Sequence, residues 1–407
     1  MKLADKVFLT ATGSLAPEAD SALTSRIGAD RTRVEAHLAA SSAAVYGFNT
    51  LFGPLDGHRV DSTAQGQLLQ GHLVGTPMEI PGPLARLVLA TKVQQLGRGG
   101  SGIHPETFAG LARAAREPLR APFRVAFGAS YGSADVVPAA WFVAGLVERK
   151  VLQLSHPGDL MTLINGNHVS TASAIAVHAA YRQRLEEAAR LVAAVADSLE
   201  RGRVPGRQLP VSLRDTGPLQ SCINSALDGL EAGLEQRLSV SGANPLFEFA
   251  PERTVVRSNS GFLDFGLTFA LTTCIQALHV AAGYLQRAVE HASDHLMVDG
   301  PSGFGFVQPP KVAQAIVEKL AIACGTMPIR FSGQDSHGIE DCRDLSLLTV
   351  LQLARGLAGF DELLSLGRRA LGQLIGQDEE HPRGGESTRE APEATEAAEI
   401  VAFLASR

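Results

Sequence analysis

The chain has 407 residues and a formal net charge of −6, which argues against a broad nucleic-acid-binding surface. It is 45% hydrophobic but only 5% aromatic, a balance that favours helices over sheets. The charged N-terminus does not resemble a signal peptide, and we expect no apolar run to span a membrane without a charge. The cysteine spacing fits neither a metal site nor a disulfide framework. We therefore expect a soluble cytoplasmic protein with no metal and with reduced thiols at Cys222, Cys274, Cys324 and Cys342.

The hydrophobic pattern, taken in chain order, predicts a succession of helices. They are expected at residues 21–40, twice within 81–125, and at about 136–147, 170–201, 219–238, 263–291, 310–324 and 341–374. Acidic residues dominate 377–399, with almost no large apolar side chain, so this tail is expected to be disordered. The final apolar residues, 400–404, are expected to form a small docking helix.

One stretch organises the chain: Gly128-Ala129-Ser130-Tyr131-Gly132-Ser133-Ala134-Asp135, in which six of eight residues are Gly, Ala or Ser. Such small residues permit tight and strained turns. The simplest interpretation is a helix start, with Asp135 or Ser133 as N-cap and Pro138 in the first turn. That interpretation does not explain why the segment before the cap is so poor in side chains.

Four other segments stand out, each with an ordinary structural interpretation. The aromatic loop 45–53 is by default a packed turn between glycines, and Asn165-Gly166 is a turn between helices. A lone histidine such as His72 is usually a satisfied structural group. A lone loop arginine such as Arg214 is usually solvated.

The motifs nevertheless resemble, in order, those of the histidine and phenylalanine ammonia-lyase family. Ser133 to Pro138 is similar to Ser-Gly-Asp-Leu-Ala-Pro, and the loop at Tyr46 to Tyr-Gly-Val/Ile-Asn-Thr-Gly-Phe-Gly. Further matches are Gly71 to Gly75 with Ser-His-Ala-x-Gly, Leu163 to Gly166 with Leu-Ile-Asn-Gly, Ser212 to Arg214 with Ser-Leu/Ile-Arg, Asn244 to Leu246 with Asn-Pro-Leu, and Gln334 to His337 with Gln-Glu-Asp-His.

The resemblance implies roles for these residues. Gly132-Ser133-Ala134 would cyclise to a methylidene-imidazolone, an electrophile built from backbone, and no other cofactor is expected. Tyr46 would be the catalytic acid/base, and Asn165 would lie beside the electrophile and the substrate. The remaining residues would bind the substrate: His72, Arg214, Asn244, Gln334 and Asp335. Among them, Arg214 would hold the substrate carboxylate.

Three departures mark the chain as a divergent, shortened member. The triad reads Gly132-Ser133-Ala134 where the family has Ala-Ser-Gly. A bent backbone with positive φ disfavours Ala134 by roughly 1 kcal/mol or more, whereas Gly132 is expected to be sterically harmless. Val211 replaces a second catalytic Tyr that the family supplies from a neighbouring subunit, and Asp335 replaces Glu.

The expected fold is mainly α, with a long central helical bundle and a smaller N-terminal part that contains some β structure. The expected division is 1–157 with the Tyr and Gly-Ser-Ala loops, 158–376 for the bundle, and 377–407 for the acidic tail. The resemblance implies a homotetramer with sites assembled from more than one subunit. We expect it to act on a small molecule, with a carrier protein as one candidate partner and with neither nucleic acid nor membrane.

Three functions stay open. The first is an ammonia-lyase or aminomutase acting on an aromatic or imidazole amino acid or a derivative. The second is the same scaffold without the electrophile, running a different elimination, addition or cyclisation in specialised metabolism. The third is a non-catalytic relative. Retention of Tyr46, Asn165 and Arg214 argues against the third, and the altered triad argues against the first.

Overall fold

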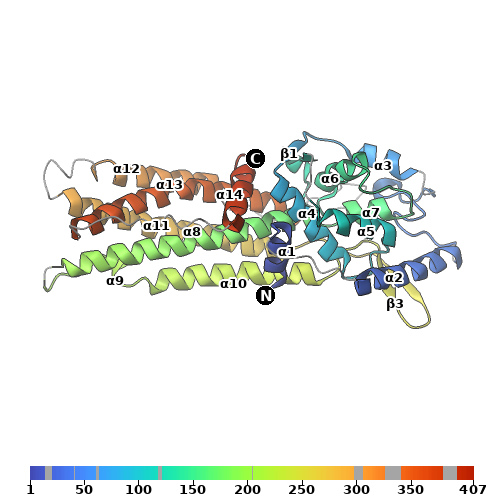
Figure 1. Cartoon of the computed structure of the whole chain (residues 1–407), viewed down its shortest axis with the longest axis horizontal. Coiled ribbons are helices and arrows are strands. Elements are labelled where there is room, and N and C mark those ends of the chain that lie inside the picture. Colours follow the sequence, from blue (N-terminus) through green and yellow to red (C-terminus); the bar gives the residue numbers. More distant parts are fainter. Residues whose placement is uncertain are drawn as a thin grey trace.

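The computed structural model describes residues 1–13, 21–40, 42–60, 64–117, 122–203, 205–297, 306–325, 341–378 and 392–407. The molecule is elongated: a bundle of long helices fills one end and a compact N-terminal part fills the other (Figure 1). This arrangement confirms the predicted mainly helical fold.

The N-terminal part consists of short helices around a two-stranded antiparallel sheet. Strand β1 (Met78–Ile80) pairs with β2 (Phe123–Val125), and Met78 lies opposite Val125. The surrounding helices are α1 (Leu3–Ala11), α2 (Ser21–Ala40), α3 (Gln65–His72), α4 (Gly82–Leu96), α5 (Pro105–Ala114), α6 (Val136–Glu148) and α7 (Asp159–Ile164).

The bundle is built from five long helices whose apolar faces meet in one core. These are α8 (His168–Arg201), α10 (Gly217–Ser239), α11 (Phe265–Met297), α12 (Pro309–Ala323) and α13 (Ser346–Asp378). The short α9 (Val211–Arg214) joins α8 to α10 at the end remote from the N-terminal part (Figure 1).

Helix α11 corrects one expectation from the sequence. It is long and apolar enough to span a membrane, although no such run was expected. In the structure 56% of its apolar window is buried, and it packs against α8, α10, α12 and α13. Its apolar character is therefore that of a bundle core helix.

A β-hairpin that the sequence pattern did not predict follows the bundle helix α10. It pairs β3 (Leu246–Phe249) with β4 (Thr254–Arg257). Phe247 packs edge-on against Phe48 at a centroid distance of 4.9 Å. These two rings, with Val34 and Val45, form a small separate core that anchors the loop carrying Tyr46.

Helix α14 (Pro392–Ala405) confirms the predicted docking helix and extends it. It packs on α8 and α13, with Ala397, Ile400, Val401 and Leu404 buried. The prediction of a disordered tail is therefore wrong for residues 377–378, which end α13, and for 392–399 in α14, while 379–391 lie outside the described residues.

Candidate active site

The Gly-Ser-Ala loop is buried and sharply bent. Gly132 has φ +83° and Ala134 has φ +60°, so two residues of the triad occupy the left-handed region. Ser133 between them is 5% exposed. The structure thus bears out the expected strain at Ala134, since a side chain in this region costs about 1–2 kcal/mol.

Glycine at position 132 fits without a clash, as expected from the sequence, and the structure shows in addition that a larger residue would not. A Cβ at this position would lie 2.8 Å from Leu345 Cδ2 and 3.3 Å from the Leu345 nitrogen. The segment before α13 therefore presses directly on the loop. Only glycine satisfies both the backbone angle and this contact.

Asp135 precedes α6, but its carboxylate does not cap that helix. Oδ2 accepts hydrogen bonds from the Ser170 backbone N–H at 2.7 Å and the Ser170 hydroxyl at 2.9 Å. The Asp135 N–H donates to Gly166 O at 2.8 Å. Asp135 thus occupies the predicted N-cap position of α6, but its carboxylate makes no capping hydrogen bond there and instead joins the loop to the first turn of α8.

Helix N-termini gather around the loop. The Asp344 N–H, just before α13, donates to Gly132 O at 2.9 Å. Asp344 Oδ1 accepts from Ser346 N at 2.9 Å, and Oδ2 accepts from Asp264 N, at the start of α11, at 2.6 Å. The starts of α6, α8, α11 and α13 thus converge, and their dipoles favour negative charge at the loop.

Buried cationic side chains lie beside this junction. Lys92 Nζ donates to Asn165 O at 2.9 Å, and burial, with Arg237 nearby, lowers the Lys92 pKa to about 7. Burial also lowers the pKa of His168 well below its usual value. Burial raises the pKa of the Asp135 carboxyl to about 7, partly offset by its hydrogen bonds from Ser170. Burial thus brings the pKa values of two groups of opposite charge type, Lys92 and Asp135, toward neutrality.

Tyr46 lies in a half-buried aromatic group at the neighbouring loop. Its hydroxyl oxygen accepts from Gly53 N at 2.8 Å. Phe52 links it to His72, with centroid distances of 6.4 Å to Tyr46 and 5.1 Å to His72. His72 Nδ1 lies 2.7 Å from Leu68 O. Through Phe52, Tyr46 and His72 belong to one aromatic wall of the candidate site.

Asn165 connects the Tyr46 loop with the triad loop. A Cβ on Gly47 would lie 2.7 Å from Met161 Cγ, and Met161 is one turn before Asn165. Asn165 Nδ2 donates to Asn244 O at 3.3 Å, whereas its buried Oδ1 has no hydrogen-bond partner within the described parts of the chain. A buried acceptor left open is a position where a ligand donor fits.

The structure does not bring every predicted site residue together within one chain. Arg214 is exposed, donates to Leu209 O at 2.7 Å, and lies on α9 at the opposite end of the molecule from α3 and α7 (Figure 1). Gln334 and Asp335 lie outside the described residues. One cavity of about 510 Å³, between α3 and the end of α6, contains none of the candidate residues.

The sequence reasoning missed the buried charges at the junction. Lys92 is the single lysine in an apolar helix, a signal that was available in the sequence. Arg237 and Asp344 give no such local signal, because they approach the loop only through the packing of α10 and α13.

Comparisons with known proteins agree with this geometry. Residues 3–205 match the family model of aromatic amino acid lyases. A histidine ammonia-lyase of Paracidovorax citrulli is 31% identical over an alignment of 163 residues. The alignment covers 34% of this chain and only about a third, 32%, of that relative.

Solved structures share the fold over nearly the whole chain. The phenylalanine aminomutase of Pantoea agglomerans has a TM-score of 0.78 at 14% identity, covering 93% of this chain and 90% of its own. The histidine ammonia-lyase of Trypanosoma cruzi has a TM-score of 0.75 at 17% identity, and the match covers 99% of this chain and 91% of that protein. The ergothioneine-degrading ergothionase of Treponema denticola has a TM-score of 0.78 at 16% identity, and the match covers 99% of this chain and 97% of that protein.

Proposed function

We propose, from its membership of the aromatic amino acid lyase family over residues 3–205, that this chain is a carbon–nitrogen lyase-like enzyme. It would catalyse elimination or migration of the amino group of an aromatic or imidazole amino acid, or of a derivative of one. Tyr46 would act as the acid/base.

One observation carries the proposal: three segments far apart in sequence form a continuous contact path. The Tyr46 loop packs on Met161, Met161 precedes Asn165, and Gly166 accepts a hydrogen bond from the Asp135 N–H beside the triad. A non-catalytic protein has no need to keep a phenol, an open amide acceptor and a strained buried loop in this order.

The loop fits the formation of a methylidene-imidazolone. Cyclisation would join the Ala134 nitrogen to the Gly132 carbonyl carbon and release two waters, one from that carbonyl oxygen and one from the Ser133 hydroxyl. The bent backbone favours closure, and the Asp344 N–H bonded to Gly132 O polarises the carbonyl. The group, once formed, would supply an electrophile for the substrate amine.

The chain's own residues would do the remaining work. Tyr46 would hold or move the substrate proton, which requires a phenol pKa below its free value of about 10. Asn165 Oδ1 would accept a hydrogen bond from the substrate, and the Phe52–His72 wall would exclude water.

We further propose that Arg214 reaches the site from another copy of the chain in a homotetramer. Within one chain it is exposed at the far end of the bundle, which suits a residue that completes a neighbour's site. A guanidinium fork matches a carboxylate. The exposed Val211 beside it cannot replace a second catalytic tyrosine.

The same scaffold acting without the electrophile is the second candidate. It is favoured by Ala134 in the third triad position and by the missing tyrosine at 211. In that case Tyr46 and Arg214 would serve a different elimination, addition or cyclisation. A small-molecule substrate is common to both candidates, and a carrier-bound substrate fits either.

Tyr46→Phe tests the proposal. The substrate panel is free histidine, phenylalanine and tyrosine together with N-acylated and thioester-linked forms, and the readouts are ammonia release and product mass. Tyr284→Phe on α11 is the matched control, since it also removes one phenol hydroxyl.

We expect slow turnover of the free amino acids, at least a hundredfold loss in Tyr46→Phe on whichever substrate is used, and no loss in the control. Equal turnover by Tyr46→Phe and wild type would remove Tyr46 from the mechanism.

A further inference from the structure

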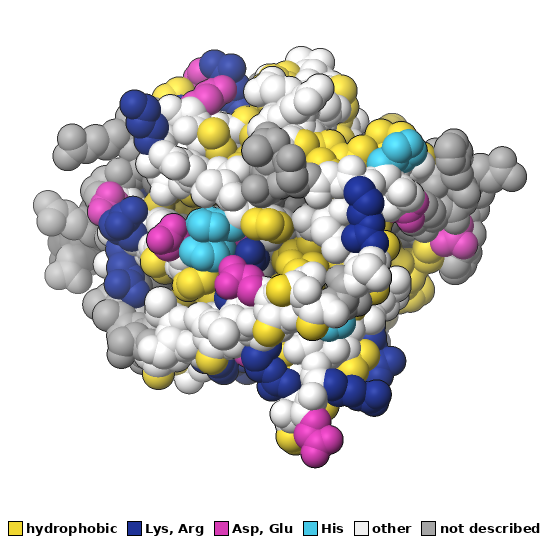
Figure 2. All heavy atoms as spheres, turned by 90° about the vertical axis from the view of Figure 1, so that its right-hand side faces the viewer, with side chains coloured by type: hydrophobic (Ala, Val, Ile, Leu, Met, Phe, Trp, Pro, Cys, Tyr) yellow, Lys and Arg dark blue, Asp and Glu magenta, His cyan; other side chains and the backbone are white. Residues whose placement is uncertain are grey.

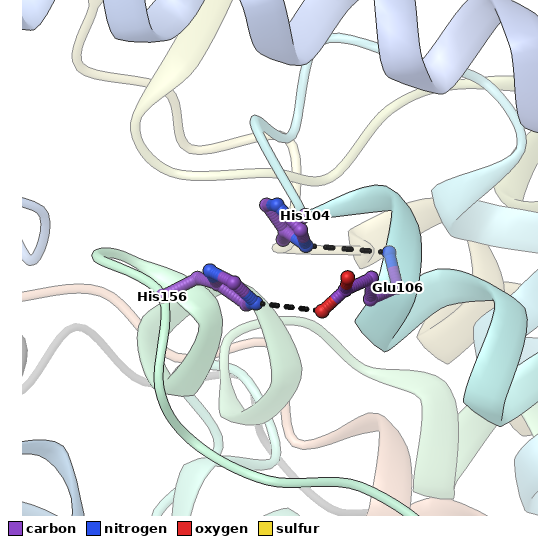
Figure 3. A group of neighbouring side chains, drawn as sticks. All are labelled: His104, Glu106 and His156. Atoms are coloured by element: carbon purple, nitrogen blue, oxygen red, sulfur yellow. Dashed lines mark hydrogen bonds and ion pairs between the residues drawn. The ribbon is translucent and has the colours of Figure 1, made fainter.

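A second cluster of chemically active side chains lies away from the candidate active site, on the N-terminal part. His104, Glu106 and His156 each offer one ligand atom within 4.8 Å of the other two, the one such group among the described residues. Figure 3 shows the side chains facing one another from the start of α5 and from the loop between α6 and α7. Figure 2 views this end of the molecule, where histidine and acidic side chains lie together at the surface.

The distances suit a shared ion. His156 Nε2 lies 3.2 Å from Glu106 Oε2, and two ligands at about 2.1 Å from one tetrahedral ion are about 3.4 Å apart. The His104 and His156 rings are stacked with centroids 3.3 Å apart. The ligand atom of His104 lies within 4.8 Å of both others.

Buried polar residues fix the two backbone segments that carry the histidines. Asp159 Oδ1 accepts from the His104 N–H at 3.0 Å, and Gln65 Nε2 donates to His156 O at 2.7 Å. Arg31, 3% exposed, donates to both Gly102 O at 2.8 Å and Pro157 O at 3.0 Å. The ligands therefore project from a framework that is already rigid, as a metal site requires.

The local charge also favours a cation. Glu106 and Glu35 lie close enough to His104 to act on it electrostatically, and Arg31 is a positive group at a similar range.

We propose that His104, His156 and Glu106 form a binding site for a divalent transition-metal ion of the zinc class. Two imidazole nitrogens and one carboxylate oxygen match the donor set of zinc, whereas calcium and magnesium prefer oxygen ligands alone. The sequence prediction of no metal rested on cysteine spacing and did not consider these histidines.

The site would tie together the segments that support the Tyr46 loop. Gly102 and Gly158, each two residues from a proposed ligand, both pack on Phe48 of that loop: a Cβ would approach its ring to 2.8 and 2.3 Å. Metal binding would clamp these segments against each other. The ion would then stabilise the folded N-terminal part without touching the reacting groups.

Zinc titration of the full-length, tag-free protein tests the proposal. Calorimetry and equilibrium dialysis with elemental analysis, in a thiol-free reductant, give stoichiometry and affinity, and thermal unfolding with and without Zn²⁺ gives a second readout. The variants are His156→Ala, Glu106→Gln and His104→Asn; Asn retains an acceptor for the Glu106 N–H that His104 now caps. His295→Ala, an exposed histidine at the end of α11, is the matched control.

We expect one Zn²⁺ per chain that is lost or at least about tenfold weaker in each site variant and unchanged in His295→Ala. The melting temperature should rise with Zn²⁺ only in wild type and control. Equal melting temperatures in chelator verify that the variants are folded. Should either histidine variant unfold, Glu106→Gln decides the question, because its side chain is 80% exposed. Zinc binding that is absent in wild type, or equal in the site variants and wild type, overturns the proposal.

Discussion

Replacing Gly132 by alanine probes the geometry of the triad loop most sharply, because alanine is the residue that the family has at this place. A side chain at φ +83° costs about 1–2 kcal/mol, and forcing a methyl to 2.8 Å from Leu345 Cδ2 costs about 1–3 kcal/mol more. Stiffening the unfolded chain returns roughly 0.4–1 kcal/mol. The variant should therefore lose about 1–5 kcal/mol of unfolding free energy.

Two other glycines separate these contributions. Gly206 has φ +84° with nothing near its would-be Cβ, so Gly206→Ala carries the backbone cost alone. Gly128 has neither constraint, and Gly128→Ala should change stability by no more than about 0.5 kcal/mol. Urea unfolding at fixed protein concentration can be followed by the fluorescence of Trp141, the single tryptophan, on α6. A loss in Gly132→Ala no larger than in Gly206→Ala would refute the contact with Leu345.

Three further predictions concern the same site. Ala134→Gly relieves the strain at φ +60°. The fraction of molecules whose intact mass is short by two waters should therefore be at least as large as in wild type, and the free energy of unfolding should change by no more than about 1 kcal/mol. A smaller fraction would show that the Ala134 methyl aids closure. The pKa of Lys92 is about 7 in the folded chain and about 10.5 for an unperturbed lysine, so the free energy of unfolding should rise as pH rises between these values. Lys92→Met should flatten that rise in urea unfolding experiments at pH 7 and pH 9. The same rise in wild type and variant would contradict the lowered pKa. Co-expressing Tyr46→Phe with Arg214→Gln, each inactive alone, should restore part of the activity, because mixed assemblies contain some sites with both native residues. No restoration would contradict the proposal that Arg214 completes the site of another copy.

Local sequence was sufficient to predict most helices. The periodic apolar pattern at residues 21–40 and 219–238 gave helices within two residues of α2 and α10, because a helix that buries one face must repeat its apolar residues at that spacing. Motif order predicts that Tyr46, His72 and Asn165 lie near one another, and Phe52 does contact both the Tyr46 and the His72 ring.

Tertiary contacts account for what the sequence did not predict. The Asp135 carboxylate accepts hydrogen bonds from Ser170 in the first turn of α8, which begins 33 residues later. Its position directly before α6 is that of an ordinary N-cap. The steric role of Gly132 depends on Leu345, and the lowered pKa of Lys92 depends on its burial and, to a lesser extent, on the charge of Arg237. None of these partners is visible within a local window of sequence.

The intact mass of the purified wild-type protein, compared with Ser133→Ala, tests the central claim most directly. Cyclisation of Gly132-Ser133-Ala134 predicts a wild-type mass short by two water molecules, and a full mass for Ser133→Ala. A full wild-type mass would contradict the self-made electrophile and leave the same scaffold to a different chemistry at Tyr46.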